Sequence, residues 1–290
     1  AAGRGPGEGP GSFVYPGSFW LDGKGNILIL DMMLDKLLKY KILDDKFQFV
    51  EEIKEPSPHP VSFAELPGSG LFAYYYPIQK NSPEDFKQYI VADKTGKVRN
   101  SYYRDSISGK FMNGNMLRFY RIGNEVKTIP FFSSKIYSID DKSMNLCYNA
   151  SWGNASFPDD KFFVKYDFGR SAELGDKLFE ETSDWIRCMY AIETPGHVFI
   201  KYYKGQDGYI SVFNKGSHQA INVKNTDIQD NLGIGGEFPE PRSTFRNDHL
   251  VGYLEMAKMD KDKIRNGELK KMIAGLSEDD NPIVIIFKLK

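Results

Sequence analysis

The chain has few of the residues on which metal sites and disulfides depend. Only 2 cysteines and 4 histidines occur among its 290 residues. Cys147 and Cys188 form neither a CxxC motif nor another metal-binding spacing. The histidines show no HxH or HExxH pattern, which argues against a zinc centre. We expect the two thiols to lie on different blades of the fold, too far apart for a disulfide.

A surplus of charge of one sign is also missing. The 38 Lys and Arg residues against 39 Asp and Glu residues give a net charge of −1. No overall field therefore attracts nucleic acid or an anionic membrane, and we expect neither as a partner. No apolar run reaches the roughly 18 residues of a transmembrane segment, and no signal peptide is recognisable. The start Ala1-Ala2-Gly3, without a methionine, favours processing or truncation.

Motifs for covalent catalysis and phosphate binding are absent from the sequence as well. It contains no GxSxG elbow, and the spacing of Ser, His and Asp residues assembles no triad. The glycine-rich segments 3–12 and 233–236 do not stand between a strand and a helix start, where a phosphate site needs them. We expect no cofactor and no metal. Helix–strand alternation is missing too, which argues against an α/β fold.

What the chain does contain is short strands in groups of four. Residues 16–22, 26–31, 36–43 and 47–53 predict four antiparallel strands joined by tight turns. Four strands in about forty residues is the size of one β-propeller blade. Further groups of four are expected within 61–103, 116–149 and 185–223. The aromatic content of 14% suits strands and the space between packed sheets.

The C-terminal stretch predicts a fifth blade with a helical insertion. Residues 242–245 and 249–257 are expected to form two strands. Apolar residues at helical spacing predict a helix over 260–276. The apolar run 283–289 is expected to pair beside 249–257, because a long hydrophobic edge would invite aggregation. We also expect the inner strand of every blade to be apolar on both faces.

Several segments resemble a six-bladed β-propeller family of exported lipoproteins from Gram-negative gut anaerobes, with NHL-like or TolB-like propellers. The matching segments are Gly-Arg-Gly-Pro-Gly-Glu at 3–8, Tyr-Asp-Phe-Gly at 166–169, Asp230 with Gly235-Gly236, and the ending 280–290. The resemblance implies an all-β, six-bladed propeller with about five blades visible here and one upstream blade missing. Residues 1–290 would then be a single domain, exported as a periplasmic or outer-membrane lipoprotein. It carries over no catalytic residue.

Loop positions supply the candidate site. Propellers bind ligands through loops between blades and between the second and third strands of a blade. This rule selects Asp31, His59, Trp152, Arg170 and Arg242 as candidate ligand-binding residues, with Asp35 and the pair Gln206 and Asp207 beside them. The last four site residues are expected on one loop face.

Three of these residues, Asp31, Asp35 and Trp152, have alternative interpretations. Asp31 and Asp35 are either a carboxylate pair for a cation or acid–base chemistry, or residues that cap a turn. Trp152 lies in a segment of small and polar residues, where it either stacks on a sugar ring or fills a gap between blades.

The sequence therefore favours an exported, non-catalytic propeller. It would act as a monomeric ligand-binding or protein-interaction module for an unidentified small molecule, glycan or protein. The alternative is a metal-dependent lactonase or esterase-type hydrolase with its site in the propeller channel. A divalent ion held by at least three carboxylate or amide groups would distinguish the enzyme.

Overall fold

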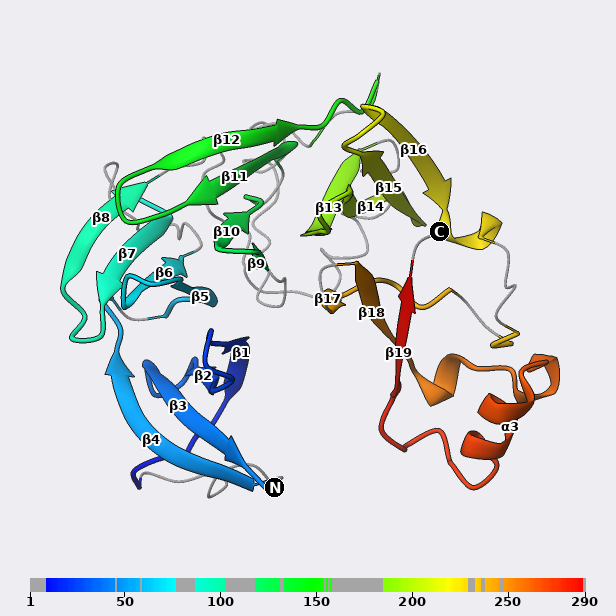
Figure 1. Cartoon of the computed structure of the whole chain (residues 1–290), viewed down its shortest axis with the longest axis horizontal. Helices are drawn as coiled ribbons and strands as arrows, with labels where there is room; N and C mark the ends of the chain where they lie inside the picture. Colours follow the sequence, from blue (N-terminus) through cyan, green and yellow to red (C-terminus); the bar gives the residue numbers. More distant parts are fainter. Residues whose placement is uncertain are drawn as a thin grey trace. The chain divides into compact units, whose positions relative to one another are not determined.

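The computed structural model describes residues 9–44, 46–57, 59–76, 87–102, 118–130, 133–153, 155, 157, 185–228, 233–235, 238–245 and 248–288. Within them, strands β1 to β19 form five antiparallel sheets, which we name A to E in chain order (Figure 1). The chain divides into two compact units, residues 1–190 and 191–290.

The first unit holds sheets A, B and C, each with four strands in chain order. Sheet A is built from β1 (Pro16–Leu21), β2 (Ile27–Asp31), β3 (Lys36–Leu43) and β4 (Lys46–Lys54). Sheet B comprises β5 (Ser62–Leu66), β6 (Leu71–Tyr75), β7 (Tyr89–Asp93) and β8 (Val98–Tyr102). Sheet C comprises β9 (Phe119–Ile122), β10 (Glu125–Thr128), β11 (Lys135–Ile139) and β12 (Met144–Asn149).

The second unit holds sheets D and E, with β13 starting just before its boundary. Sheet D comprises β13 (Ile186–Glu193), β14 (His197–Lys204), β15 (Asp207–Asn214) and β16 (Gln219–Lys224). Sheet E comprises β17 (Ser243–Phe245), β18 (His249–Leu254) and β19 (Ile283–Lys288). The predicted fold class is confirmed: this is an all-β propeller of four-stranded antiparallel blades with one small C-terminal α-helix. The described residues form five sheets, of which A to D have four strands and E has three.

The helical insertion is shorter than predicted. The α-helix α3 spans only Gly267–Ile273, and the 3-10 turns η2 (Met256–Lys258) and η3 (Lys261–Lys263) precede it; another, η1 (Asn225–Asp227), follows sheet D. Asn266 starts α3, because its side-chain oxygen accepts hydrogen bonds from the backbone N–H groups of Glu268 and Leu269, both at 3.1 Å. The predicted helical face was wrong at Met272, which is 66% exposed. The predicted strand 249–257 ends at Leu254, where the chain turns towards η2.

The C-terminal strand pairs as predicted. β19 runs antiparallel to β18, with Leu254 opposite Ile283 and His249 opposite Lys288. The segment between them leaves the sheet, forms α3 and returns (Figure 1). Six buried residues anchor this excursion in one apolar cluster with Ile283 and Ile285 of β19 against it: Ile234, Leu254, Met256, Ile264, Leu269 and Ile273.

Sheets A, B and C bury their apolar side chains against one another. One cluster joins Leu28, Leu30 and Leu37 of sheet A to Phe63 and Tyr74 of sheet B. A second cluster joins sheet B to sheet C: Ala64, Tyr75, Tyr89, Val91, Phe119, Val126 and Ile139. Sheet B is therefore covered on both faces, as the packing of successive blades requires.

The inner strands follow the predicted apolar pattern only in part. In β5 four of the five residues are buried, the other, Glu65, only partly. β1 differs, because Phe19 is 63% exposed and Leu21 is 54% exposed. One face of sheet A is therefore more exposed to solvent than either face of a blade that has a neighbouring sheet on each side.

The sequence predicts that Cys147 and Cys188 form no disulfide, and the structure is consistent with this at Cys147. Cys147 lies on β12 as an exposed, free thiol. The side chain of Cys188 lies outside the described residues. Among the helices of the described residues, none has the length and apolar character needed to span a membrane.

A buried carboxyl group lies next to sheets A and B. Glu55 follows β4, is 6% exposed, and neither of its carboxylate oxygens accepts a hydrogen bond among the described residues. Burial, with smaller contributions from the charges of Asp35 and Asp31, raises its pKa to about 8. The ionised group also raises the pKa of the buried phenols of Tyr74 and Tyr76, whose own burial is the larger cause.

We predict that Glu55→Gln stabilises the protein at neutral pH. The unfolded chain releases this proton near pH 4.5 and the folded chain near pH 8, so stability falls as pH rises between these values. At roughly 1.4 kcal/mol for each pH unit, the gain at pH 7 is on the order of 3 kcal/mol in the free energy of unfolding. Urea unfolding at pH 4.5, 6, 7 and 8 measures it.

The matched control is Glu52→Gln on β4, three residues before Glu55, where the carboxylate is 44% exposed and pairs with Lys36 at 3.1 Å. Its effect should stay within about 1 kcal/mol at every pH, as for other surface ion pairs. If Glu55→Gln shows no greater gain at pH 8 than at pH 4.5, Glu55 is not a buried neutral acid.

We predict that deleting residues 281–290 gives insoluble protein. The deletion removes β19, opens the paired edge of β18 and uncovers the cluster around Leu254 and Ile273. Solubility after lysis and sedimentation velocity measure the outcome. The complete chain with Val284→Thr is the control, because Val284 is 65% exposed on the same strand. A soluble, folded deletion would contradict the role assigned to β19.

Candidate functional site

A pocket of about 290 Å³ lies within the second unit. Its walls come from the β14–β15 turn, the end of β16 with η1, the extended segment 238–242, and β18 with the residues after it. The polar side chains that line it are Tyr203, Gln206, Asp207, Lys224, Asn225, Thr226, Glu240, Arg242, Tyr253 and Glu255. A compact set of amides, hydroxyls and charges therefore shares one concave surface.

Glu240 is the centre of the pocket's polar network. It forms ion pairs with Lys201 and, at 3.1 Å, with Arg242, and it accepts a hydrogen bond from the Asn225 amide at 3.1 Å. Burial by itself would raise the pKa of Glu240, but the hydrogen bond and charge of Lys201, followed by Arg242 and Asn225, hold it below its ordinary value. Glu240 is therefore ionised at neutral pH.

Local sequence explains why Glu240 reaches these partners. It stands between Pro239 and Pro241, which fix an extended backbone and cannot join a helix. The next residue, Arg242, donates its backbone N–H to the carbonyl of Val251 at 2.7 Å and so attaches the segment to β18. The Pro-Glu-Pro-Arg sequence thereby places one carboxylate and one guanidinium side by side.

Aromatic rings contact both cations of the network. The Lys201 ammonium lies 5.0 Å from the ring centroid of Tyr203, and the Arg242 guanidinium lies 5.5 Å from that of Tyr253. Gly208 leaves the space for this arrangement, because a Cβ atom there would come within 2.9 Å of the Lys201 ammonium nitrogen. The site is therefore held by packing as well as by charge.

A second ion pair stands at the mouth of the pocket. Lys224 contacts Asp207 at 2.8 Å, with side chains 32% and 50% exposed. The hydrogen bond to Asp207 is the main cause that raises the pKa of Lys224. Gln206 lies in the β14–β15 turn and Asp207 begins β15, in the hairpin that the sequence had selected. Most of the charge around the pocket is thus neutralised by pairs inside the protein.

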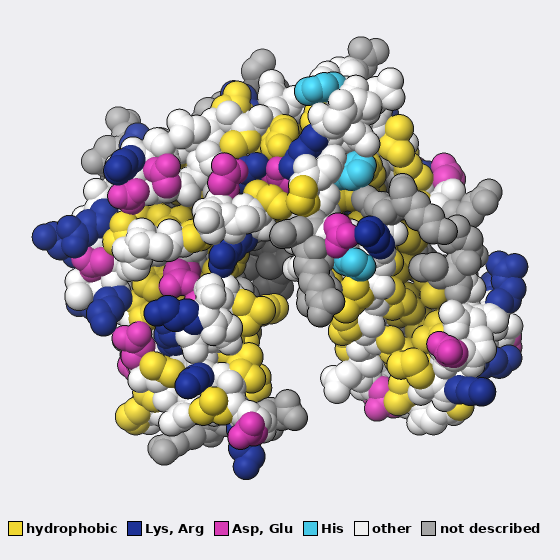
Figure 2. Space-filling view, in the orientation of Figure 1, with side chains coloured by type: hydrophobic (Ala, Val, Ile, Leu, Met, Phe, Trp, Pro, Cys, Tyr) yellow, Lys and Arg dark blue, Asp and Glu magenta, His cyan; other side chains and the backbone are white. Residues whose placement is uncertain are grey.

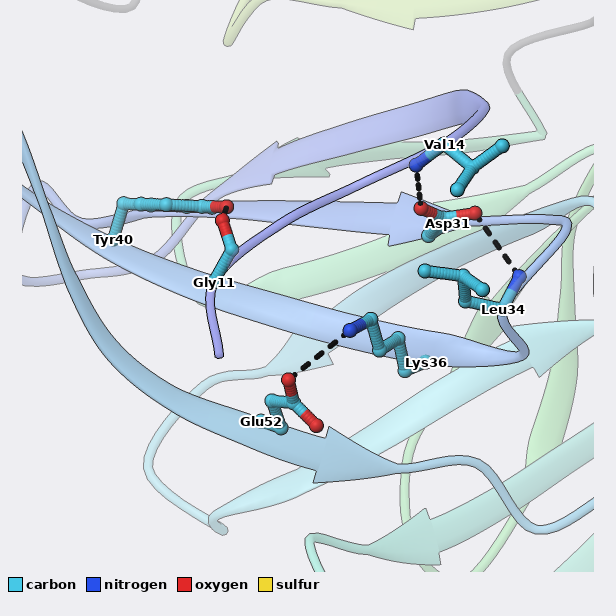
Figure 3. A network of polar contacts seen from close by, with 7 residues as sticks. All are labelled: Gly11, Val14, Asp31, Leu34, Lys36, Tyr40 and Glu52. Atoms are coloured by element: carbon cyan, nitrogen blue, oxygen red, sulfur yellow. Dashed lines mark hydrogen bonds and ion pairs between the residues drawn. The ribbon is translucent and has the colours of Figure 1, made fainter. Parts of the chain in front are cut away.

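The carboxylate of the predicted site residue Asp31 accepts hydrogen bonds from four backbone N–H groups. Asp31 is fully buried, and the donors are the backbone N–H groups of Val14 and Leu34 (Figure 3), and those of Tyr15 and Met33. These bonds hold the turn between β2 and β3 and the chain entering β1. This geometry fits the capping interpretation of Asp31.

His59 and Asp35 pair with each other in the first unit. The Asp35 carboxylate accepts the His59 backbone N–H at 2.9 Å and lies 3.0 Å from the ring Nδ1. Both residues adopt positive φ angles, 49° for Asp35 and 65° for His59. The pair ties the β2–β3 turn to the loop before β5, and the His59 side chain remains 63% exposed.

The remaining predicted residues divide between the units. Trp152 follows β12 in the first unit, is half-buried and meets the Phe157 ring edge-on at 6.4 Å, which fits the packing interpretation. Arg170 lies outside the described residues. Arg242 lines the pocket of the second unit, together with Gln206 and Asp207, which the sequence had selected beside it. In the described part of the chain, no group of three or more His, Cys, Asp or Glu side chains is placed to hold a metal ion.

Sequence reasoning did not find Glu240, Lys201, Asn225 or Tyr253. The usable signal was the Pro-Glu-Pro-Arg segment, in which two charges stand on a rigid extended backbone. Lys201 gave a weaker signal: it is a lysine in the middle of the apolar strand β14 and is only 2% exposed. Buried lysines require a partner.

Comparison with known proteins identifies the family. Residues 4–252 match the family described as 6-bladed beta-propeller. The chain belongs to this six-bladed β-propeller family. A comparison with curated proteins finds no match.

Among solved structures, a Bacteroides fragilis protein named "putative exported protein" is similar over 99% of this chain and 80% of its own, with 20% identity and a TM-score of 0.78. At this identity the likeness shows the propeller fold alone. Virginiamycin B lyase from Staphylococcus aureus is 13% identical over 81% of this chain and 61% of its own, with a TM-score of 0.43.

We predict that Glu240→Ala destabilises the protein by about 3 kcal/mol, because it leaves the buried Lys201 ammonium without its counter-charge. The double variant Glu240→Gln, Lys201→Met should recover most of this loss.

Because the pKa of Glu240 is lowered, the stabilisation is present above its ordinary value of 4.5 and is lost as the pH falls through the lowered pKa. Urea unfolding measures each variant.

The exposed pair at the same pocket provides the control. Asp207→Ala removes the partner of Lys224, and its effect should stay below about 1 kcal/mol, since water replaces the lost contact. Equal losses for Glu240→Ala and Asp207→Ala would show that burial of the Lys201–Glu240 pair is unimportant.

Proposed function

We propose that this propeller is a non-catalytic ligand-binding module and that the pocket around Glu240 and Arg242 is its binding site. The observation that supports this proposal is the convergence of amide, hydroxyl and guanidinium groups with tyrosine rings on one concave surface of about 290 Å³. Small-molecule sites combine such a cavity with a few fixed polar groups that orient the ligand.

The chemistry of the lining favours a small polar ligand without a large net charge. The cations Lys201, Arg242 and Lys224 already pair with Glu240 and Asp207. A strongly charged ligand would have to compete with these pairs, whereas a polyhydroxylated one can use the exposed donors and acceptors. The volume is near the lower end of the roughly 300–1,000 Å³ usual for ligand pockets. A mono- or disaccharide fits both requirements.

We further propose that the protein is exported and works as a monomer, in the periplasm or as an outer-membrane lipoprotein with an NHL-like or TolB-like propeller. The family membership and the name of the similar Bacteroides fragilis protein support an exported location. Small-molecule, glycan and protein ligands remain distinct outcomes of a binding experiment, and the pocket favours the first two.

The hydrolase alternative has its own test. Asp31 would be the residue to supply a carboxylate for metal-dependent lactone or ester hydrolysis, but its oxygens accept backbone hydrogen bonds. Lactone and ester substrates are offered with Mg²⁺, Ca²⁺ or Zn²⁺. Turnover that Asp31→Ala abolishes while the variant stays folded would overturn the non-catalytic proposal.

We predict that Arg242→Ala weakens binding of a saccharide at least tenfold. The guanidinium is 38% exposed at the pocket and is fixed by Glu240 and Tyr253, so it can donate to ligand hydroxyls without reorganising. A panel of neutral mono- and disaccharides is screened by ligand-observed NMR, and titration calorimetry gives the affinity of any hit for each variant.

Arg99→Ala is the matched control, because Arg99 is also an ion-paired arginine, bound to Asp93 at 2.8 Å in the first unit. It should bind the saccharide as the parent protein does. A hit whose affinity is the same in Arg242→Ala and Arg99→Ala binds elsewhere, which would contradict the proposed site.

A further inference from the structure

Asn225 carries a hydrogen-bond acceptor that has no donor. It begins η1 and lines the pocket around Glu240, and its amide nitrogen Nδ2 donates to Oε1 of Glu240 at 3.1 Å. Because the ionised Glu240 carboxylate can only accept, the Asn225 atom that faces it must be the nitrogen. The other amide atom, Oδ1, is buried and accepts no hydrogen bond among the described residues.

The carboxylate that holds Asn225 also holds a donor beside it. The Arg242 guanidinium contacts Oε2 of Glu240 at 3.1 Å, whereas Asn225 contacts Oε1. Both oxygens belong to one carboxylate group, so the Asn225 amide and the Arg242 guanidinium are held close together. The pocket therefore presents an acceptor and a donor side by side.

The unpaired Asn225 oxygen gives the pocket a basis for selection. A buried acceptor that no donor reaches costs free energy, because it has lost its hydrogen bonds to water. A ligand with a donor at this position removes the cost, and a ligand without one leaves it in place. Sites built in this way reject an analogue that lacks the hydrogen-bonding group much more strongly than apolar pockets do.

We propose that Asn225 determines the specificity of the pocket by accepting a hydrogen bond from one ring hydroxyl of a saccharide. This inference rests on the binding site proposed above and adds the residue that makes it selective. A hydroxyl can donate to Oδ1 of Asn225 while it, or its neighbour on the ring, accepts from Arg242. A cationic ligand would be repelled by Arg242, and an anionic group has no proton to donate to Asn225.

The surface charges agree with a neutral ligand. On the face viewed in Figure 2, Lys and Arg side chains are interspersed with Asp and Glu side chains. A mixed surface of this kind does not attract an ionic ligand through a field of one sign. The ligand reaches Asn225 past Gln206 and Thr226, which line the same pocket and are exposed. Exposed side chains change rotamer within nanoseconds, so they can admit a hydroxyl group.

Deoxyfluoro analogues of a bound saccharide test the role of Asn225. Each analogue has one ring hydroxyl replaced by fluorine, which is similar in size but cannot donate a hydrogen bond. The reference ligand is the saccharide of the neutral panel that binds most tightly, and titration calorimetry gives its affinity and that of each analogue. We expect one analogue to bind the parent protein at least tenfold more weakly than the reference saccharide. In Asn225→Ala the two should differ by less than about twofold, as in a double-mutant cycle.

The ratio of the two affinities separates specificity from structure. If Asn225 only supported Glu240, Asn225→Ala would weaken both ligands alike and leave the tenfold ratio unchanged. Asn222→Ala is the matched control, because Asn222 is an exposed asparagine on β16 and is not one of the residues that line the pocket. It should keep the tenfold ratio.

Two results would overturn the role of Asn225: a tenfold ratio that persists in Asn225→Ala, or no analogue that loses affinity for the parent protein. In either case a loss of saccharide binding in Arg242→Ala would still support the pocket as the binding site. If no saccharide of the panel binds, the role of Asn225 and the proposed site are both overturned. Asn225→Ser, whose hydroxyl is too short to reach the position of Oδ1, replaces Asn225→Ala if that variant does not fold.

Discussion

Face-to-face packing of antiparallel sheets is the interaction on which the rest of this structure depends. A four-stranded sheet can satisfy its own backbone hydrogen bonds but cannot bury either of its faces alone. Leu28, Leu30 and Leu37 are fully buried because sheet B lies against them, and Tyr89 is fully buried because sheet C covers the next face. The same constraint explains why Phe19 is exposed where no described sheet follows.

Each ionisable side chain that is buried between these elements is stabilised in a specific way. Asp31 is fully buried, and backbone N–H groups of the adjoining turn occupy its carboxylate. Lys201 is buried and pairs with Glu240. The Glu55 carboxyl group has neither hydrogen-bond donors nor a counter-charge among the described residues. Burial therefore raises its pKa to about 8 and keeps it in the neutral form. The three cases show one rule: a buried charge is paired, hydrogen-bonded or removed by protonation.

The pocket follows from the same rule. The Pro-Glu-Pro-Arg segment brings Glu240 to the buried Lys201, and Arg242 is fixed beside it by Tyr253 and by its bond to β18. A network needed to neutralise Lys201 therefore also holds Arg242 at the rim of a concave surface. The binding role proposed for this surface depends on that fixed position of Arg242.

The sequence by itself determined the strands and their grouping, because turns such as Gly23–Gly25 and alternating apolar residues are local signals. It also determined the pairing of β19 with β18, since so apolar a strand must be covered. It overestimated the helix before β19: α3 buries only Leu269 and Ile273, Met272 is exposed, and Ile264 joins the same apolar cluster from outside the helix. Only the tertiary structure decided the site. Lys201, Asn225, Glu240 and Tyr253 come from four separate elements, and no local pattern records which distant charges will be buried together.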